Sequence, residues 1–132
     1  MKKTSKTQEE WRSELNDLEY YVLRESGTER PFSGEYYEHQ EKGTYSCRAC
    51  NHPLFDSEHK YHSGCGWPSF WTELAEAEIV QKLDRSHGMT RIELRCPSCD
   101  SHLGHIFNDG PKPKGLRYCI NSVCLKFEAK KG

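Results

Sequence analysis

Seven cysteines divide this chain into candidate metal ligands and candidate reactive thiols. Four of them form two Cys-x-x-Cys pairs, and each such turn lets two sulfurs reach one ion. Four thiolates suit a tetrahedral Zn²⁺, and a shell filled by protein sulfurs leaves no position for a substrate. The pairs therefore predict one structural zinc, with the ligands Cys47, Cys50, Cys96 and Cys99.

The segment between the two pairs, residues 51–95, is longer than the roughly 15–20 residues of a simple zinc ribbon. An ion held by both pairs would therefore join two separated parts of the fold. The same four sulfurs also suit iron. One pair acting as a redox dithiol is a further alternative, but two pairs in one short chain favour a shared ion.

Three cysteines remain for chemistry: Cys65, Cys119 and Cys124. Cys65 lies in HSGCGWPSF between two glycines, which permit close approach of another backbone or a ligand. Cys119 lies in RYCINS, where alternation along a strand puts Arg117, Cys119 and Asn121 on one face. A thiol beside a fixed positive charge and an amide donor is a candidate thiolate nucleophile.

Two histidines stand between these cysteines, in the segment HLGHIFNDGP. His102 and His105 are candidate proton donors near a reactive thiol. Each feature alone also has an ordinary structural explanation, because a buried thiol is usually inert and a tryptophan such as Trp67 usually packs in a core. Taken one at a time, these features favour the structural explanation.

The elements that must position these residues begin with an amphipathic helix. Thr7 and Glu10 have the spacing of a capping box, which predicts a helix over about residues 8–23. We expect its apolar stripe to pack onto the rest of the domain. The stripe consists of Trp11, Leu15, Leu18 and Val22.

Residues 27–45 show no sustained periodicity, so we expect an ordered loop that wraps the domain. Short segments of β character follow, separated by Gly, Pro, Asn and Asp, and predict a catalytic β core over about residues 45–127. Strands do not alternate with long helices, which argues against a parallel α/β sheet and hence against a thioredoxin-like fold. We predict one domain over residues 1–132, mainly β with an N-terminal helix, whose antiparallel sheets form a small barrel-like or tent-like core joined by zinc.

Composition limits the partners and the compartment. Hydrophobic residues make up 34% of the chain, which predicts a lean core, and a structural zinc can add on the order of 10 kcal/mol of folding free energy. The net charge of −1 provides no strong field, so we expect no nucleic-acid or membrane partner. An odd cysteine count without an apolar signal segment predicts a cytoplasmic protein. A monomer is the default expectation.

Five motifs occur in a fixed order: the first Cys-x-x-Cys pair, GCGWPSF, the second pair, HLGHIFNDGP and RYCINS. This order, from about residue 18 to residue 127, resembles that of the B-type methionine sulfoxide reductases. The resemblance implies reduction of the R epimer of methionine sulfoxide, chiefly within proteins, with thioredoxin regenerating the enzyme. Zinc-bearing members of that family hold their ion at the two Cys-x-x-Cys pairs.

The resemblance also implies roles for single residues. Cys119 would attack the sulfoxide, Cys65 would resolve the resulting sulfenic acid, and Trp67 would pack its ring against the methyl group of the substrate. The other residues of the site, which would hold water or the sulfoxide oxygen, form its apolar side or lie near the thiol, are His102, His105, Asn121, Phe107 and Arg117.

Cys124 departs from the family, which often has serine there, and leaves the recycling thiol open. Because Cys119 and Cys124 are an odd number of residues apart, they would point to opposite faces of a strand, and this favours Cys65. Two rival functions are a zinc-ribbon interaction module and a peroxide-sensing thiol protein. The first explains the four paired cysteines but not Cys65, Cys119 and the two histidines.

Overall fold

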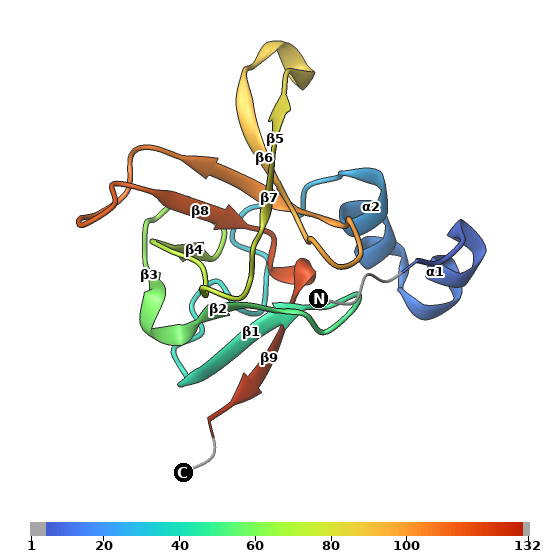
Figure 1. Ribbon diagram of the computed structural model, residues 1–132, viewed down its shortest axis with the longest axis horizontal. Helices are drawn as coiled ribbons and strands as arrows, with labels where there is room; N and C mark the ends of the chain where they lie inside the picture. Colours follow the sequence, from blue (N-terminus) through green and yellow to red (C-terminus); the bar gives the residue numbers. More distant parts are fainter. Residues whose placement is uncertain (1–4, 131–132) are drawn as a thin grey trace.

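The computed structural model describes residues 5–130, and two antiparallel sheets dominate this part of the chain (Figure 1). The smaller sheet has the strand order β2-β1-β9 and the larger one the order β3-β4-β8-β7-β6-β5. The helices are α1 (Gln8–Glu14) and α2 (Asp17–Glu25), and the strands are β1 (Gly43–Cys47), β2 (Pro53–Asp56), β3 (Lys60–Tyr61), β4 (Ser69–Phe70), β5 (Val80–Asp84), β6 (Arg91–Arg95), β7 (His102–Phe107), β8 (Arg117–Ile120) and β9 (Leu125–Ala129).

This architecture confirms the predicted mainly β fold with antiparallel sheets. Every strand pair of the described chain is antiparallel, in contrast to the parallel sheet of a thioredoxin-like fold. Strands β1 and β5 to β9 overlap the sequence segments of β character, whereas β2, β3 and β4 were not predicted. Those segments are TYSCRA, EIVQKLD, TRIELRC, HLGHIF, LRYCIN and VCLKF. Strands β3 and β4 have only two residues each, too few for an alternating pattern to be visible.

The larger sheet separates a core face from an open face, because successive side chains of a strand point to opposite sides. On the core face, Phe70 of β4, Tyr118 of β8 and Ile106 of β7 lie side by side in register and are buried. On the other face, the same three strands place Ser69, Cys119 and His105 in one row. The predicted nucleophile therefore lies in the middle of a sheet whose opposite face is packed.

The prediction of a single N-terminal helix over residues 8–23 is wrong in one respect, because this segment forms two helices, α1 and α2. Thr7 and Glu10 form the expected capping box of α1, but Asn16 and Glu19 form a second capping box that begins α2. The break shifts the buried face, so that Leu18 is 47% exposed while Leu23 is buried.

A long connection between α2 and β1, residues 26–42, contains neither helix nor strand and ends three residues earlier than predicted, because β1 starts at Gly43. It packs on the turn η3 (Ser122–Cys124) that follows β8. The amide of Tyr36 donates to Ser122 Oγ at 2.8 Å, and a Cβ on Gly34 would lie 2.2 Å from Ser122 Cβ. This connection thus reaches the end of the strand that bears Cys119.

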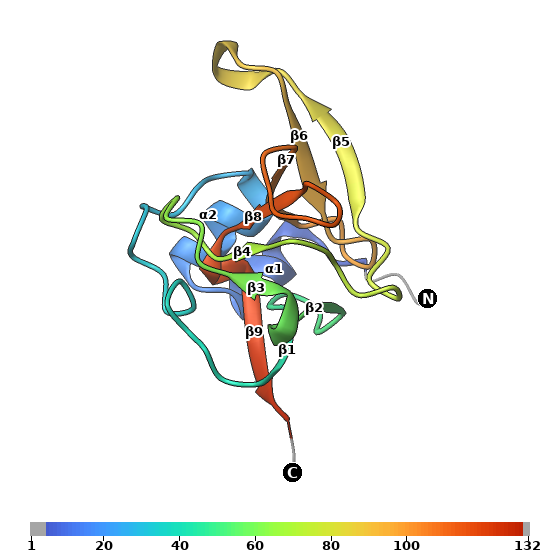
Figure 2. The same ribbon diagram turned by 90° about the vertical axis from the view of Figure 1, so that its left-hand side faces the viewer.

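Strands β5 and β6 form a hairpin that extends beyond the rest of the molecule in both views (Figures 1 and 2). Its base pairs with β7 through the register Glu93 opposite His105. The hairpin thereby brings the side chains of Asp84 and Glu93 next to the two histidines of β7. Within residues 5–130, no helix has the length and apolar character needed to span a membrane.

Candidate active site and metal centre

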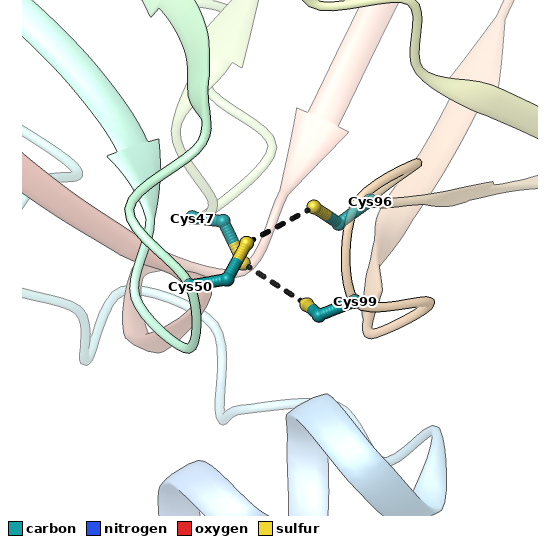
Figure 3. Close-up of side chains that lie close together, drawn as sticks. All are labelled: Cys47, Cys50, Cys96 and Cys99. Atoms are coloured by element: carbon teal, nitrogen blue, oxygen red, sulfur yellow. Dashed lines mark hydrogen bonds between the residues drawn. The ribbon is translucent and has the colours of Figure 1, made fainter. Parts of the chain in front are cut away.

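The four paired cysteines lie together between the two sheets (Figure 3). Their sulfurs all lie within 4.8 Å of one another, with Cys47 Sγ 3.7 Å from Cys99 Sγ and Cys50 Sγ 3.5 Å from Cys96 Sγ. A tetrahedron with metal–sulfur bonds of about 2.3 Å has edges of about 3.8 Å. These sulfurs therefore have the spacing and the chemistry of a metal site that joins β1 to β6.

The two metal-binding turns are built alike. In each, the residue after the second cysteine has a positive φ, 68° at Asn51 and 59° at Asp100, a conformation that Asn and Asp tolerate better than most residues. Its amide donates to the carbonyl oxygen of the first cysteine, at 2.7 Å from Asn51 and 2.9 Å from Asp100. Arg24 of α2 braces the second turn by donating to the carbonyl of Cys99 at 2.7 Å.

A second pair of sulfurs lies on the open face of the larger sheet. Cys65 Sγ is 3.7 Å from Cys119 Sγ, although 54 positions separate the two residues. Cys119 sits in β8, and Cys65 sits in a loop between Gly64 and Gly66, whose φ angles are 80° and 98°. Only glycine adopts these angles readily, so the GCG sequence lets the loop bring Cys65 to Cys119.

These two thiols influence each other's ionisation. Hydrogen bonds from Cys119 first and then from Ser63 and Ser69 lower the pKa of the Cys65 thiol to about 4, although burial acts in the opposite direction. The contact with Cys65 and burial raise the pKa of the Cys119 thiol, against the positive charge of Arg117. The two sulfurs therefore titrate as a pair: one proton is lost below the usual range of a thiol and the other is retained, and the positive charge of Arg117 favours the thiolate form of Cys119.

The sulfurs open into a cavity of about 220 Å³, large enough for one unbranched side chain. It brings together every predicted site residue outside the metal centre except His102. Its wall consists of Thr28, Cys65, Trp67, Arg91, Gly104, His105, Phe107, Arg117, Cys119 and Asn121. Gly104 has a steric reason to lack a side chain, because a Cβ there would lie 2.0 Å from the carbonyl oxygen of Cys119.

Both histidines of β7 pair with a carboxylate from the neighbouring hairpin. His105 Nε2 lies 2.8 Å from Asp84 Oδ2, and His102 Nδ1 lies 2.6 Å from Glu93 Oε2. Burial, opposed by the hydrogen bond to Asp84, lowers the pKa of His105. Each carboxylate fixes which ring nitrogen is engaged and leaves Nδ1 of His105 and Nε2 of His102 as the remaining proton sites.

His102 is the predicted site residue that the structure places outside the cavity wall. A register shift in the pairing of β6 with β7 turns its ring toward His105, with the ring centroids 5.5 Å apart. Its side chain is buried, and its Nε2 has no hydrogen-bond partner among the described residues. His102 thus lies behind His105 as seen from the cavity.

Comparison with known proteins identifies the family of this chain. A model of the SelR domain matches residues 15–129. The chain belongs to the SelR domain family. It is 53% identical over 132 residues to the peptide methionine sulfoxide reductase MsrB of Hahella chejuensis, covering 100% of this chain and 95% of the relative. Identity to the MsrB of Pseudomonas putida (strain W619) is 54% over 132 residues, covering 100% and 99%, and to that of Herminiimonas arsenicoxydans 56% over 127 residues, covering 96% and 93%.

Within this SelR domain, Glu29 is a site residue that the sequence did not reveal. Its amide donates to Asn121 Oδ1 at 3.0 Å, and its carbonyl oxygen accepts from Trp67 Nε1 at 3.0 Å. Its side-chain Oε1 accepts from the amide of Val123 at 2.8 Å, and the residue is only 2% exposed. Glu29 therefore fixes two walls of the cavity at once, the indole and the amide.

Two contacts fix the side chain of Arg117. Its guanidinium makes a two-point ion pair with Asp109, at 2.8 and 3.2 Å, and lies 4.3 Å from the ring centroid of Phe107. Such a pair fixes the orientation of the guanidinium as well as its charge. Phe107 and Arg117 thus form one wall of the SelR cavity through a cation–π contact.

Cys124 lies apart from this chemistry. Its side chain is fully buried in η3, and its thiol donates to the carbonyl oxygen of His102 at 3.2 Å. Burial raises the pKa of this thiol well above its usual value. A neutral, enclosed thiol is a poor nucleophile, so Cys124 has the character of a packing residue.

The buried carboxyl of Glu29 predicts a pH-dependent difference in stability. Burial raises its pKa above 4.5, against opposing hydrogen bonds, so the folded state retains a proton that the unfolded state loses as the pH rises past 4.5. Native Glu29 thus contributes less stability at pH 8 than at pH 4.5. We therefore expect the difference in unfolding temperature, Glu29→Gln minus wild type, to become more positive as the pH rises from 4.5 to 8. Calorimetry measures this difference.

Glu35→Gln is the control, because Glu35 lies in the same connection but is exposed and pairs with Arg48. A Glu29→Gln curve that runs parallel to the wild-type curve from pH 4.5 to pH 8 would contradict a raised pKa at this position.

Proposed function

We propose that this protein reduces the R epimer of methionine sulfoxide in proteins to methionine, with thioredoxin as the reductant. The observation that supports this most directly is the contact of 3.7 Å between the Cys65 and Cys119 sulfurs inside a cavity lined by Trp67, Phe107 and His105. Its relatives are named as reductases of peptide methionine sulfoxide. We infer further that residues 1–132 act as one domain and as a monomer.

The reaction begins at Cys119. Its sulfur attacks the sulfoxide sulfur as a thiolate, while the proton that the pair retains rests on Cys65 Sγ, 3.7 Å away, and Arg117 stabilises the charge on Cys119. The sulfoxide oxygen ends on Cys119, which becomes a sulfenic acid, and methionine leaves. The Cys65 sulfur then attacks Cys119, an S–S bond forms and water leaves, so two thiols have been oxidised for each sulfoxide reduced.

His105 delivers the proton that the sulfoxide oxygen needs. It lines the cavity beside Cys119, its partner across the β7–β8 pairing. Because Asp84 engages its Nε2, its Nδ1 donates when the ring is in its protonated, charged form. Asp84 stabilises the protonated ring, and the buried His102 and Glu93 pair lies behind it. Acid catalysis is worth about 10²–10⁴-fold, which exceeds the roughly threefold net gain expected from lowering a thiol pKa by two units.

The choice of substrate and epimer rests on three fixed positions around the sulfoxide sulfur. The indole of Trp67 takes the methyl group, because a thioether methyl packs well on an aromatic ring. The His105 and Asn121 side takes the oxygen, and the cavity mouth takes the rest of the chain. Exchanging any two groups on the chiral sulfur would misplace the oxygen.

The metal held by the four paired cysteines is Zn²⁺ in this proposal, in a structural role. Four thiolates fill its shell, so it would connect β1 to β6 and take no part in the reaction. Iron is the alternative that the same sulfurs accept.

Turnover of each epimer of a dabsyl-labelled methionine sulfoxide tests the proposed activity. We expect the R epimer to react at least about 10²-fold faster than the S epimer, because the cavity fixes the oxygen position. Stoichiometric substrate should consume two thiols, mapped to Cys65 and Cys119, and Cys119→Ser should be inactive. A disulfide mapped to Cys124, or equal rates with both epimers, would refute the assignment.

If His105 donates the proton, its loss should slow sulfoxide reduction much more than it changes the alkylation rate of Cys119. His105→Ala should slow sulfoxide reduction by about 10²-fold or more, and His102→Ala by less, because only His105 lines the cavity. Alkylation of Cys119 by iodoacetamide should change by less than about threefold in both variants. His59→Ala is the control, since His59 packs on Trp71 outside the cavity wall. Equal losses in the two assays would count against proton donation.

Metal removal should destabilise the fold. We expect complete chelation, or Cys50→Ser, to lower the unfolding temperature by about 10 °C or more, because the metal joins the two sheets. Cys65→Ser should retain the metal and most of the stability. Elemental analysis identifies the metal as zinc or iron, and an unfolding temperature unaffected by its full removal would exclude a structural role.

A further inference from the structure

Phe32 has an unusual combination of backbone conformation and exposure. Its φ is 65°, in the left-handed region that a bulky residue rarely adopts. Among the large hydrophobic residues within 5–130, it is the most exposed, at 65%. A conformation of this kind costs free energy and persists only where its surroundings impose it. Because the Phe32 ring is exposed, its burial does not offset the free-energy cost of the positive φ.

The conformation is imposed by the loop that bears Cys65. The amide of Phe32 donates to the carbonyl oxygen of Gly66 at 2.7 Å, and its ring meets Tyr37 edge-on with centroids 5.2 Å apart. A Cβ on Gly66 would lie 2.7 Å from Pro31 Cβ and 3.2 Å from Phe32 Cε2. The exposed ring is therefore fixed against the residue that follows Cys65.

This ring lies outside the sulfoxide cavity. The connection of residues 26–42 contributes Thr28 to the cavity wall, whereas Pro31 and Phe32 are absent from it. A methionine side chain seated at Trp67 would therefore not need this surface. Phe32 instead contacts Gly66, the residue after Cys65, and the ring of Tyr37 joins it to His62. Pro31, Phe32, His62 and Gly64 are all exposed.

We propose that these four residues, Pro31, Phe32, His62 and Gly64, form the docking surface for the protein dithiol that reopens the Cys65–Cys119 disulfide. This inference rests on the proposed function, which requires such a reductant. The four residues provide the fixed phenyl ring of Phe32 and the imidazole of His62 and contain no carboxylate, and the exposed Arg30 adjoins Pro31 in the sequence. Short-lived redox encounters bury small interfaces, and a rigid aromatic anchor is the kind of residue that dominates binding in an interface.

The position of the surface also favours Cys65 over Cys119 as the sulfur attacked, because Gly64 and the Phe32 contact at Gly66 flank Cys65, whereas Cys119 lies within β8. A thiolate of the docked reductant attacks Cys65 Sγ, a mixed disulfide forms, and the bond from Cys65 to Cys119 breaks. Cys119 leaves as a thiolate beside the positive charge of Arg117 and then takes up a proton. The second thiol of the reductant attacks its own mixed-disulfide sulfur, releasing Cys65 and leaving the reductant as a disulfide, so that two electrons pass to this protein.

The test compares a protein reductant with a small one. Phe32→Asn removes the ring while keeping a residue that tolerates positive φ, and Leu18→Asn removes an exposed apolar side chain from α2 as the control. The disulfide form of each is prepared with one equivalent of hydrogen peroxide. Its reduction by thioredoxin or by dithiothreitol is followed by stopped-flow fluorescence.

We expect Phe32→Asn to lower the second-order rate constant with thioredoxin about tenfold, while Leu18→Asn changes it by less than about twofold. The rate with dithiothreitol and the single-turnover rate with methionine sulfoxide should stay within about twofold of wild type. An unchanged thioredoxin rate overturns the proposal, and so does an equal loss with dithiothreitol or a slower sulfoxide step. Because peroxide forms the disulfide, failure of sulfoxide turnover in the wild type would refute the proposed function separately.

Discussion

The pairing of β8 between β4 and β7 is the constraint on which the rest of the site depends. It places Cys119 between Ser69 and His105 on the open face of a sheet whose other face is core. The pairing is close enough at Gly104 that a side chain there would meet the Cys119 carbonyl at 2.0 Å. The nucleophile is therefore fixed by its strand, and the loop with positive φ angles at Gly64 and Gly66 brings Cys65 to it.

The metal centre and the SelR cavity are two consequences of the same strands. Strand β6 ends in the metal-binding turn at Cys96, while its Glu93 faces His105 and holds His102. A metal that fixes the end of β6 to β1 thus also fixes the strand that supplies a carboxylate to the histidines. This explains how an ion with a filled shell can matter to a reaction that it does not enter.

Much of this arrangement was predictable from the sequence because the signals are local. Cysteine spacing predicted that Cys47, Cys50, Cys96 and Cys99 lie together. Alternation in RYCINS predicted that Arg117, Cys119 and Asn121 share one face, and these three residues line one cavity. The second capping box, Asn16 with Glu19, is also present in the sequence. The apolar stripe from Trp11 to Val22 runs across it, however, and predicts one continuous helix. Glu29 and Asp84 could not be found in this way, because they meet the site through contacts across 92 and 21 positions. Those contacts depend on register and loop path, which no local pattern encodes.

The two sides of the cavity depend on different parts of the chain. The β5–β6 hairpin supplies the carboxylates that orient the histidines, so the handling of protons depends on its pairing with β7. The connection of residues 26–42 holds Trp67 and Asn121 through the backbone of Glu29, so the shape of the cavity depends on how it packs against η3. The hairpin and the connection are separate elements. A change in the hairpin can therefore alter acid catalysis without altering the shape of the cavity that receives the substrate. The connection also fixes Phe32 beside Cys65, which places substrate fit and access to the disulfide on the same side of the site.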